Sequence, residues 1–181
     1  MIATLFGKKK VDEDKAATIF VNAILRLTEV GFPTVVEELR ESPEFERPPE
    51  FGPGDDELFA TIILAGNLME LPNHVDAGHD RRIACMAVSK FAQAFGLDST
   101  ELEKDVKALQ SFMARINHPS KNTVYAMGKC VFHKYDLFSY QELYFRELKA
   151  PNPIILKRIN GLMSCFLWDW AQYQEQYRIT N

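Results

Sequence analysis

The chain lacks the short motifs that identify common enzyme classes. Neither glycine-rich phosphate loop, GxGxxG or GxxxxGK[ST], occurs among its 181 residues, and HExxH, Glu-x-x-His and Gly-x-Ser-x-Gly are also missing. No CxxC pair is present, so neither a zinc site nor a disulfide framework of a secreted protein is indicated. These absences favour a role without catalysis and without a cofactor.

Long apolar runs and an excess of basic residues are missing as well. Lys157, Arg158 and Asp169 interrupt the most apolar stretch, which is then too short for the run of about 18 residues that a membrane span needs. The net charge of −4 provides no electrostatic reason for a nucleic-acid or anionic-membrane partner. The first ten residues place apolar side chains before three lysines, the reverse of a signal peptide. We therefore expect a soluble, cytoplasmic protein that binds neither nucleic acid nor membrane.

The residues that are present suit a globular core. Hydrophobic residues make up 46 % of the chain and include 13 Phe, 6 Tyr and 2 Trp, which excludes general disorder. We expect residues 1–181 to form a single helical domain, with a flexible basic lead at residues 1–11. Cys85, Cys130 and Cys165 lie far apart in apolar patterns, as reduced cysteines in a core do.

Apolar residues at steps of three and four, with capping, glycine and proline signals at the boundaries, predict an all-α fold. No strand pattern competes with the helices. Three capping boxes, Thr34 with Glu37, Thr100 with Glu103 and Ser139 with Glu142, mark helix starts. The expected helices cover residues 12–30, a short segment from 34, 55–69, 81–95, a segment from 98–100 to 118, 121–134, a segment from 139, and 153–178.

The stretch Pro153–Arg178 has the strongest pattern and is predicted to be one long helix. Pro153 suits its first turn, and two rows of apolar residues make it apolar on most sides. Other helices should pack around it, forming an irregular bundle of about seven or eight helices. Trp168 lies off the main apolar stripe, so it either belongs to the core or anchors a protein partner.

The segment 42–54 is predicted to be a loop rich in Pro, Glu and Phe. It contains four of the nine prolines, so neither a helix nor a central strand is expected. Between Glu37 and Glu57 the chain has nine acidic and two basic side chains. Phe45 and Phe51 stand in this polar loop and have two interpretations: their rings plug into the bundle, or they are anchors for a protein partner.

The most chemically suggestive segment is the loop 74–80. It contains His74, Asp76, His79 and Asp80, residue types that could bind a divalent metal or act as an acid–base pair. The adjacent His79-Asp80 pair resembles the metal-binding pair of the HD-domain phosphohydrolases, but no earlier histidine is present to complete that family's pattern. The other interpretation is that Asp76 or Asp80 caps the next helix and both histidines are exposed.

Two functions follow from these patterns. The first is a non-enzymatic interaction protein that binds another protein or a second copy of itself, with Phe45, Phe51 and Trp168 as contacts. The alternative is a metal-dependent or small-molecule-binding enzyme that uses the loop 74–80, with a divalent metal as its cofactor.

Overall fold

The computed structural model describes residues 7–180, and within that range the chain forms eight α-helices, one 3₁₀ helix and two short strands. The mostly helical class is therefore confirmed. In chain order, the elements are β1 (Lys9–Asp12), α1 (Glu13–Arg40), α2 (Asp55–His74), α3 (His79–Phe95), α4 (Ser99–Asn117), α5 (Thr123–Lys134), the 3₁₀ helix η1 (Leu137–Tyr140), α6 (Leu143–Leu148), α7 (Pro153–Ser164), α8 (Trp170–Gln176) and β2 (Tyr177–Thr180).

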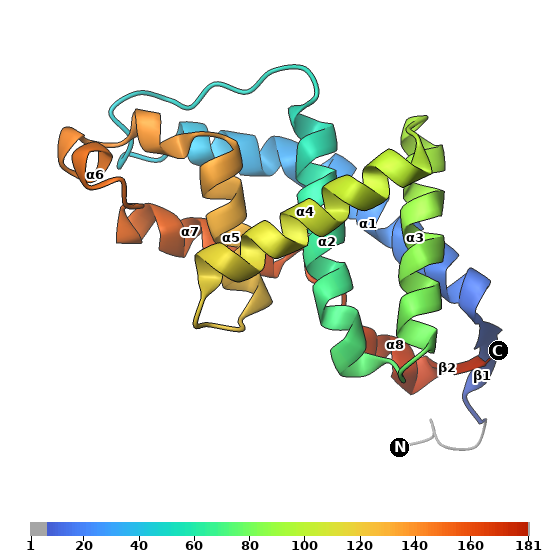
Figure 1. The fold of residues 1–181 in the computed structure, drawn as a ribbon. Coiled ribbons are helices and arrows are strands. Elements are labelled where there is room, and N and C mark those ends of the chain that lie inside the picture. Colours follow the sequence, from blue (N-terminus) through green and yellow to red (C-terminus); the bar gives the residue numbers. More distant parts are fainter. Residues whose placement is uncertain (1–6, 181) are drawn as a thin grey trace.

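Helix α2 lies at the centre of the arrangement (Figure 1). Residues 59–68 are buried without interruption, because α1, α3, α4 and α5 pack around them. Gly66 admits the side chain of Met127 from α5, since a Cβ at Gly66 would lie 2.4 Å from Met127 Sδ. The nearly all-apolar sequence of this helix thus correctly predicts a buried position, although the helix continues to His74 rather than ending at Met69.

Helix α1 continues for 28 residues through Gly31 and Pro33, so the predicted division into two helices at Gly31 is wrong. The capping box expected at Thr34 and Glu37 does not form, because both residues lie inside the helix. The physical reason is an apolar stripe that keeps helical spacing across the predicted boundary. This stripe contains the buried residues Phe20, Ile24, Thr28, Val35 and Leu39.

Helix α1 is long and apolar enough to cross a membrane, by length and composition only. This is weak evidence for a membrane span, because the core helix of a soluble protein passes the same test.

The predicted long C-terminal helix is wrong. Helix α7 ends at Ser164, and the described residues that follow form only the short helix α8 and the strand β2. The buried side chain of Asn67 in α2 occupies the junction between α7 and α8. Its Nδ2 donates to Phe166 O at 2.9 Å, and its Oδ1 accepts from Trp168 N at 2.7 Å. In a continuous helix these two backbone groups would instead bond within the helix, and α8 would be carried away from α2.

Strands β1 and β2 pair in parallel, with Val11 opposite Ile179, and bring the two ends of the described chain together (Figure 1). The expectation of no strand is therefore wrong. Residues 9–11 of the expected flexible lead belong to β1. Residues 1–6 of that lead lie outside the described part of the chain. Val11 is buried, and Thr180 Oγ1 donates to Val11 O at 3.3 Å. Four residues is the shortest run in which alternation predicts a strand, and Lys9–Asp12 contains a single apolar residue.

The helix expected from Ser139 is replaced by η1 and α6. Ser139 Oγ donates to the Asp136 carboxylate, and Glu142 forms no side-chain cap, so the predicted capping box is absent. Gln141 is buried between the two pieces, and its Nε2 donates to Ala150 O at 3.1 Å. This bond joins the two ends of the segment that contains α6, and no residue of α6 is buried. Helices α3, α4 and α5 lie where the sequence predicts them, with small shifts at their ends.

Candidate functional site

The four candidate residues of the loop 74–80 do not gather at one point. His74 lies beside Glu70, with 3.7 Å between Nε2 and Oε2. Asp76 and His79 border a polar cavity of about 560 Å³ next to β2. Asp80 Oδ1 accepts from two backbone N–H groups at the start of α3, at 2.8 and 2.7 Å. Within residues 7–180, no group of three or more His, Cys, Asp or Glu side chains could hold a metal ion, so the structure does not support the alternative metal site.

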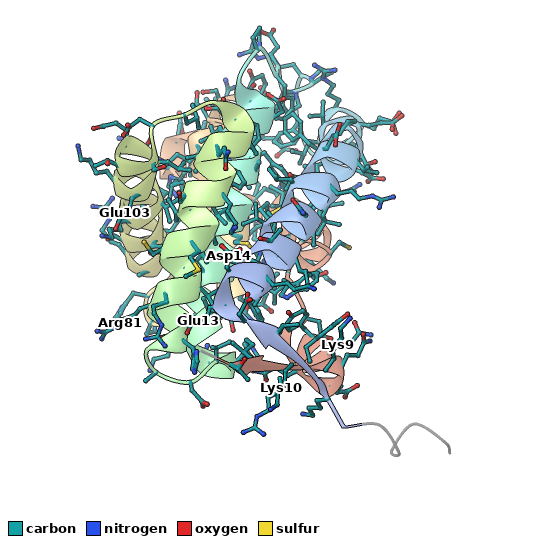
Figure 2. All side chains as sticks on the ribbon, turned by 90° about the vertical axis from the view of Figure 1, so that its right-hand side faces the viewer. Lys9, Lys10, Glu13, Asp14, Arg81 and Glu103 are labelled. Carbon is teal, nitrogen blue, oxygen red and sulfur yellow. The ribbon has the colours of Figure 1, made fainter. Side chains whose placement is uncertain are left out.

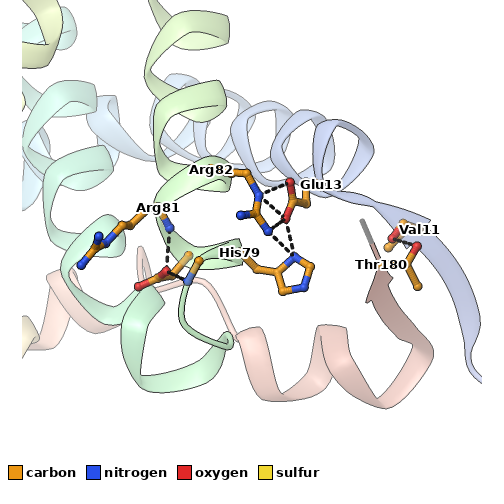
Figure 3. A network of polar contacts seen from close by, with 8 residues as sticks. Val11, Glu13, His79, Arg81, Arg82 and Thr180 are labelled. Carbon is orange, nitrogen blue, oxygen red and sulfur yellow. Dashed lines mark hydrogen bonds and ion pairs between the residues drawn. The ribbon is translucent and has the colours of Figure 1, made fainter.

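His79 instead joins a network around a buried carboxylate (Figure 3). Glu13, the first residue of α1, is buried although it is charged. Arg82 Nε donates to both carboxylate oxygens of Glu13, at 2.9 and 2.8 Å. The Nδ1 atom of His79 is hydrogen-bonded to the same carboxylate. The network fastens the first turn of α1 to the first turn of α3 with charge-assisted bonds.

We expect Glu13→Gln to lower the free energy of unfolding by about 1 kcal/mol at neutral pH. The Arg82 guanidinium lowers the pKa of Glu13 from its ordinary value of 4.5, assisted by His79 and opposed by burial. Because the folded-state pKa is lowered, this stabilisation is present above the ordinary value and is lost as the pH falls through the folded-state pKa. Urea unfolding should therefore show a difference between wild type and variant that shrinks as the pH falls below the ordinary pKa of 4.5. A difference that does not change with pH would contradict this role of the charge.

Phe45 and Phe51 lie against the body of the protein. Phe45 is buried, and its ring meets that of Tyr140 edge-on, with centroids 6.5 Å apart. Phe51 is half-buried, with its ring centroid 5.4 Å from that of Tyr135 and 6.1 Å from that of Phe32. These contacts match the interpretation in which both rings plug the acidic loop into the bundle. Partner binding by these rings stays a prediction.

Trp168 lies in the junction between α7 and α8 and is half-buried. Its ring centroid is 6.3 Å from those of Phe20 and Trp170, and 6.1 Å from that of Tyr173. Its Nε1 is buried and has no hydrogen-bond partner in residues 7–180. The ring thus belongs to an aromatic cluster of the protein's own core, and a role as partner anchor stays a prediction.

An apolar groove of about 600 Å³ lies between α2, α3 and α4. Helices α3 and α4 diverge from the turn that joins them, and α2 lies between them (Figure 1). The apolar lining consists of Leu68, Leu71, Pro72, Ala84, Val88 and Val106, and the other lining residues are Asp80, Arg81, Cys85, Ser89, Ser99, Thr100, Glu103, Lys107 and Gln110.

Exposed apolar side chains gather on helix α6. Leu143, Tyr144 and Leu148 are 57 %, 66 % and 57 % exposed, and none of the six residues of this helix is buried. Because successive helical residues are about 100° apart, the three side chains fall within an arc of about 140°. Ile154, also exposed, follows at the start of α7, and α6 and α7 lie at the same end of the molecule (Figure 1). Adjacent exposed apolar residues of this kind are typical of contact surfaces.

Comparison of the chain with family models, curated proteins and solved structures finds no match. The sequence patterns did not indicate the surface on α6, because the exposure of its apolar residues depends on which elements lie nearby. Arg82 was also not among the predicted site residues, although it lies one turn after His79 and shares its helix face. The spacing of His79 and Arg82 could therefore have indicated that the two side chains lie together, whereas nothing in the sequence connects them to Glu13.

Proposed function

We propose that the protein is a non-enzymatic, cytoplasmic interaction module, a single domain that binds a second copy of itself through α6 rather than nucleic acid or a membrane. The exposure of Leu143, Tyr144 and Leu148 on one short helix carries this proposal. Val30 and Tyr125, which are also large, apolar and exposed, lie on α1 and α5. Single exposed apolar residues are ordinary, whereas a contiguous group on one helix calls for a partner surface.

The sequence around α6 suits an antiparallel pair of identical helices. A two-fold axis through the centre of the helix would place Leu143 of one copy beside Leu148 of the other. Two-fold dimers require such a self-complementary patch.

The size of the patch determines the expected affinity. Stable interfaces bury about 1,200–2,000 Å² in total, which is more than two six-residue helices supply. Ile154 and the neighbouring loops would therefore add to the contact. We expect a weak, reversible dimer with a Kd of about 10–100 µM.

Leu148→Glu should make the protein monomeric in sedimentation equilibrium at concentrations up to about 1 mM, because it places a charge against Leu143 of the other copy. The unfolding temperature should change by less than about 2 °C, since Leu148 is exposed in the folded chain. Val30→Glu is the matched control: Val30 is at least as exposed but lies on α1, so this variant should dimerise like the wild type. A wild-type chain that stays monomeric at about 1 mM would contradict self-association.

A further inference from the structure

The groove between α2, α3 and α4 has the size and lining of a small-molecule site. Its volume of about 600 Å³ falls within the range of about 300–1,000 Å³ that is common for such sites. The apolar lining is aliphatic, with Leu68, Leu71, Val88 and Val106 as its larger members, and no aromatic residue among residues 7–180 lines the groove. Without a ring for stacking, this lining suits a flexible alkyl chain better than a planar ring system.

At the rim, Arg81 offers a positive charge with which an anionic head group can pair. Lys107 Nζ donates to Glu103 Oε1 at 2.6 Å, so this pair is neutral. Asp80 lies at the rim, with Oδ1 held by backbone N–H groups at the start of α3. The guanidinium of Arg81 is exposed and pairs with no other side chain in residues 7–180. Arg81 and Glu103 lie on the same side of the molecule, on α3 and α4 (Figure 2).

We propose that this groove binds an amphipathic anion with a linear alkyl chain, whose chain covers Leu68, Leu71, Val88 and Val106 and whose head group pairs with Arg81. Most of the affinity comes from the chain, because each buried methylene tightens binding about fourfold. The exposed ion pair contributes about fivefold in total, and the neighbouring Asp80 carboxylate keeps this contribution small.

The reactivity of Cys85, compared with that of the other cysteines, measures how far the groove is occupied by a ligand. Cys85 lines the groove and is exposed, and Cys165, at the end of α7, is exposed and serves as an internal control. Burial raises the pKa of Cys130 to about 12, so this thiol reacts slowly. Saturating decanoate, below its micelle concentration, should slow modification of Cys85 by at least about fivefold and leave Cys165 unchanged. Octanoate should require about sixteenfold higher concentration, because it lacks two methylenes.

Two variants separate the contributions of chain and head group in titration calorimetry. Arg81→Gln should weaken decanoate about fivefold and leave decanol unchanged. Cys85→Trp should fill the groove and abolish binding of both compounds, whereas Cys165→Trp, the matched control, should leave both unchanged. The three positions are exposed, so the unfolding temperature should verify that every variant is folded.

The outcomes are distinct. Equal protection of Cys85 and Cys165, or no protection at about 1 mM decanoate, would overturn the proposal because binding would be unspecific or absent. Decyltrimethylammonium binding as tightly as decanoate would overturn the pairing with Arg81. Stronger protection by decyl phosphate than by decanoate would support the site and assign a phosphate head group to its ligand. None of these results depends on α6, which lies at the other end of the molecule (Figure 1).

Discussion

Replacing Asn67 by leucine should lower the free energy of unfolding by about 3–4 kcal/mol, the largest single effect that we expect in this protein. Asn67 is fully buried in α2, and it bonds to Phe166 O and to Trp168 N at 2.9 and 2.7 Å. Leucine has a similar size but can form neither bond. Two backbone groups would then be unpaired in the core, at a cost of about 1–3 kcal/mol each. Urea unfolding followed by tryptophan fluorescence measures the loss.

Asn67→Asp is the matched control, because aspartate has the same shape. It can still accept from Trp168 N, but it places an oxygen against Phe166 O. Burial should raise the pKa of the introduced carboxyl group above its ordinary value. A raised folded-state pKa means that the variant is destabilised when ionised and regains stability relative to the wild type as the pH falls through that pKa. The deficit of Asn67→Leu should not change with pH. A leucine variant within about 0.5 kcal/mol of the wild type would show that the junction does not depend on these bonds.

Gly31→Ala should lower the free energy of unfolding by about 2 kcal/mol, although alanine in a helix interior usually stabilises by about 1 kcal/mol relative to glycine. A Cβ at Gly31 would lie 2.6 Å from both Cε1 and Cζ of Phe166. The ring of Phe166 cannot easily retreat, because it is buried and packs edge-on against Phe59 with centroids 5.0 Å apart. Steric overlap therefore outweighs the gain in helix propensity. Thermal or urea unfolding decides the sign.

Gly161→Ala provides the control for helix propensity. Gly161 lies in α7, is exposed, and a Cβ there would meet no other heavy atom within 4 Å. We expect this variant to gain about 0.5–1 kcal/mol. If Gly31→Ala were stabilised equally, the packing of Phe166 on α1 would not limit this position. Because Phe166 also accepts a bond from Asn67, the effects at Gly31 and Asn67 should not be additive.

Local patterns predicted those helices whose boundaries depend on nearby residues. Gly96 ends α3 in the left-handed conformation. Asp98 caps α4 by accepting from the N–H groups of Thr100 and Glu101, so the capping box predicted at Thr100 and Glu103 does not form. Such signals act within a single turn, so the sequence contains them in full. The candidate site was predictable only in part. His79 was identified, but its partner Glu13 is 66 positions away, and no local rule connects the two.

The sequence by itself determined the mostly helical class and the burial of α2, because apolar spacing depends only on the chemistry of neighbouring residues. Tertiary structure alone decided where the C-terminal segment breaks. Its apolar spacing continues from Phe166 to Trp170, so a helix would satisfy the local pattern. The break is held by Asn67, about 100 residues earlier, whose side chain bonds to backbone groups that a helix would have used itself. The same holds for α6, because its apolar residues are exposed only where neighbouring elements leave them uncovered, and local spacing does not contain that information.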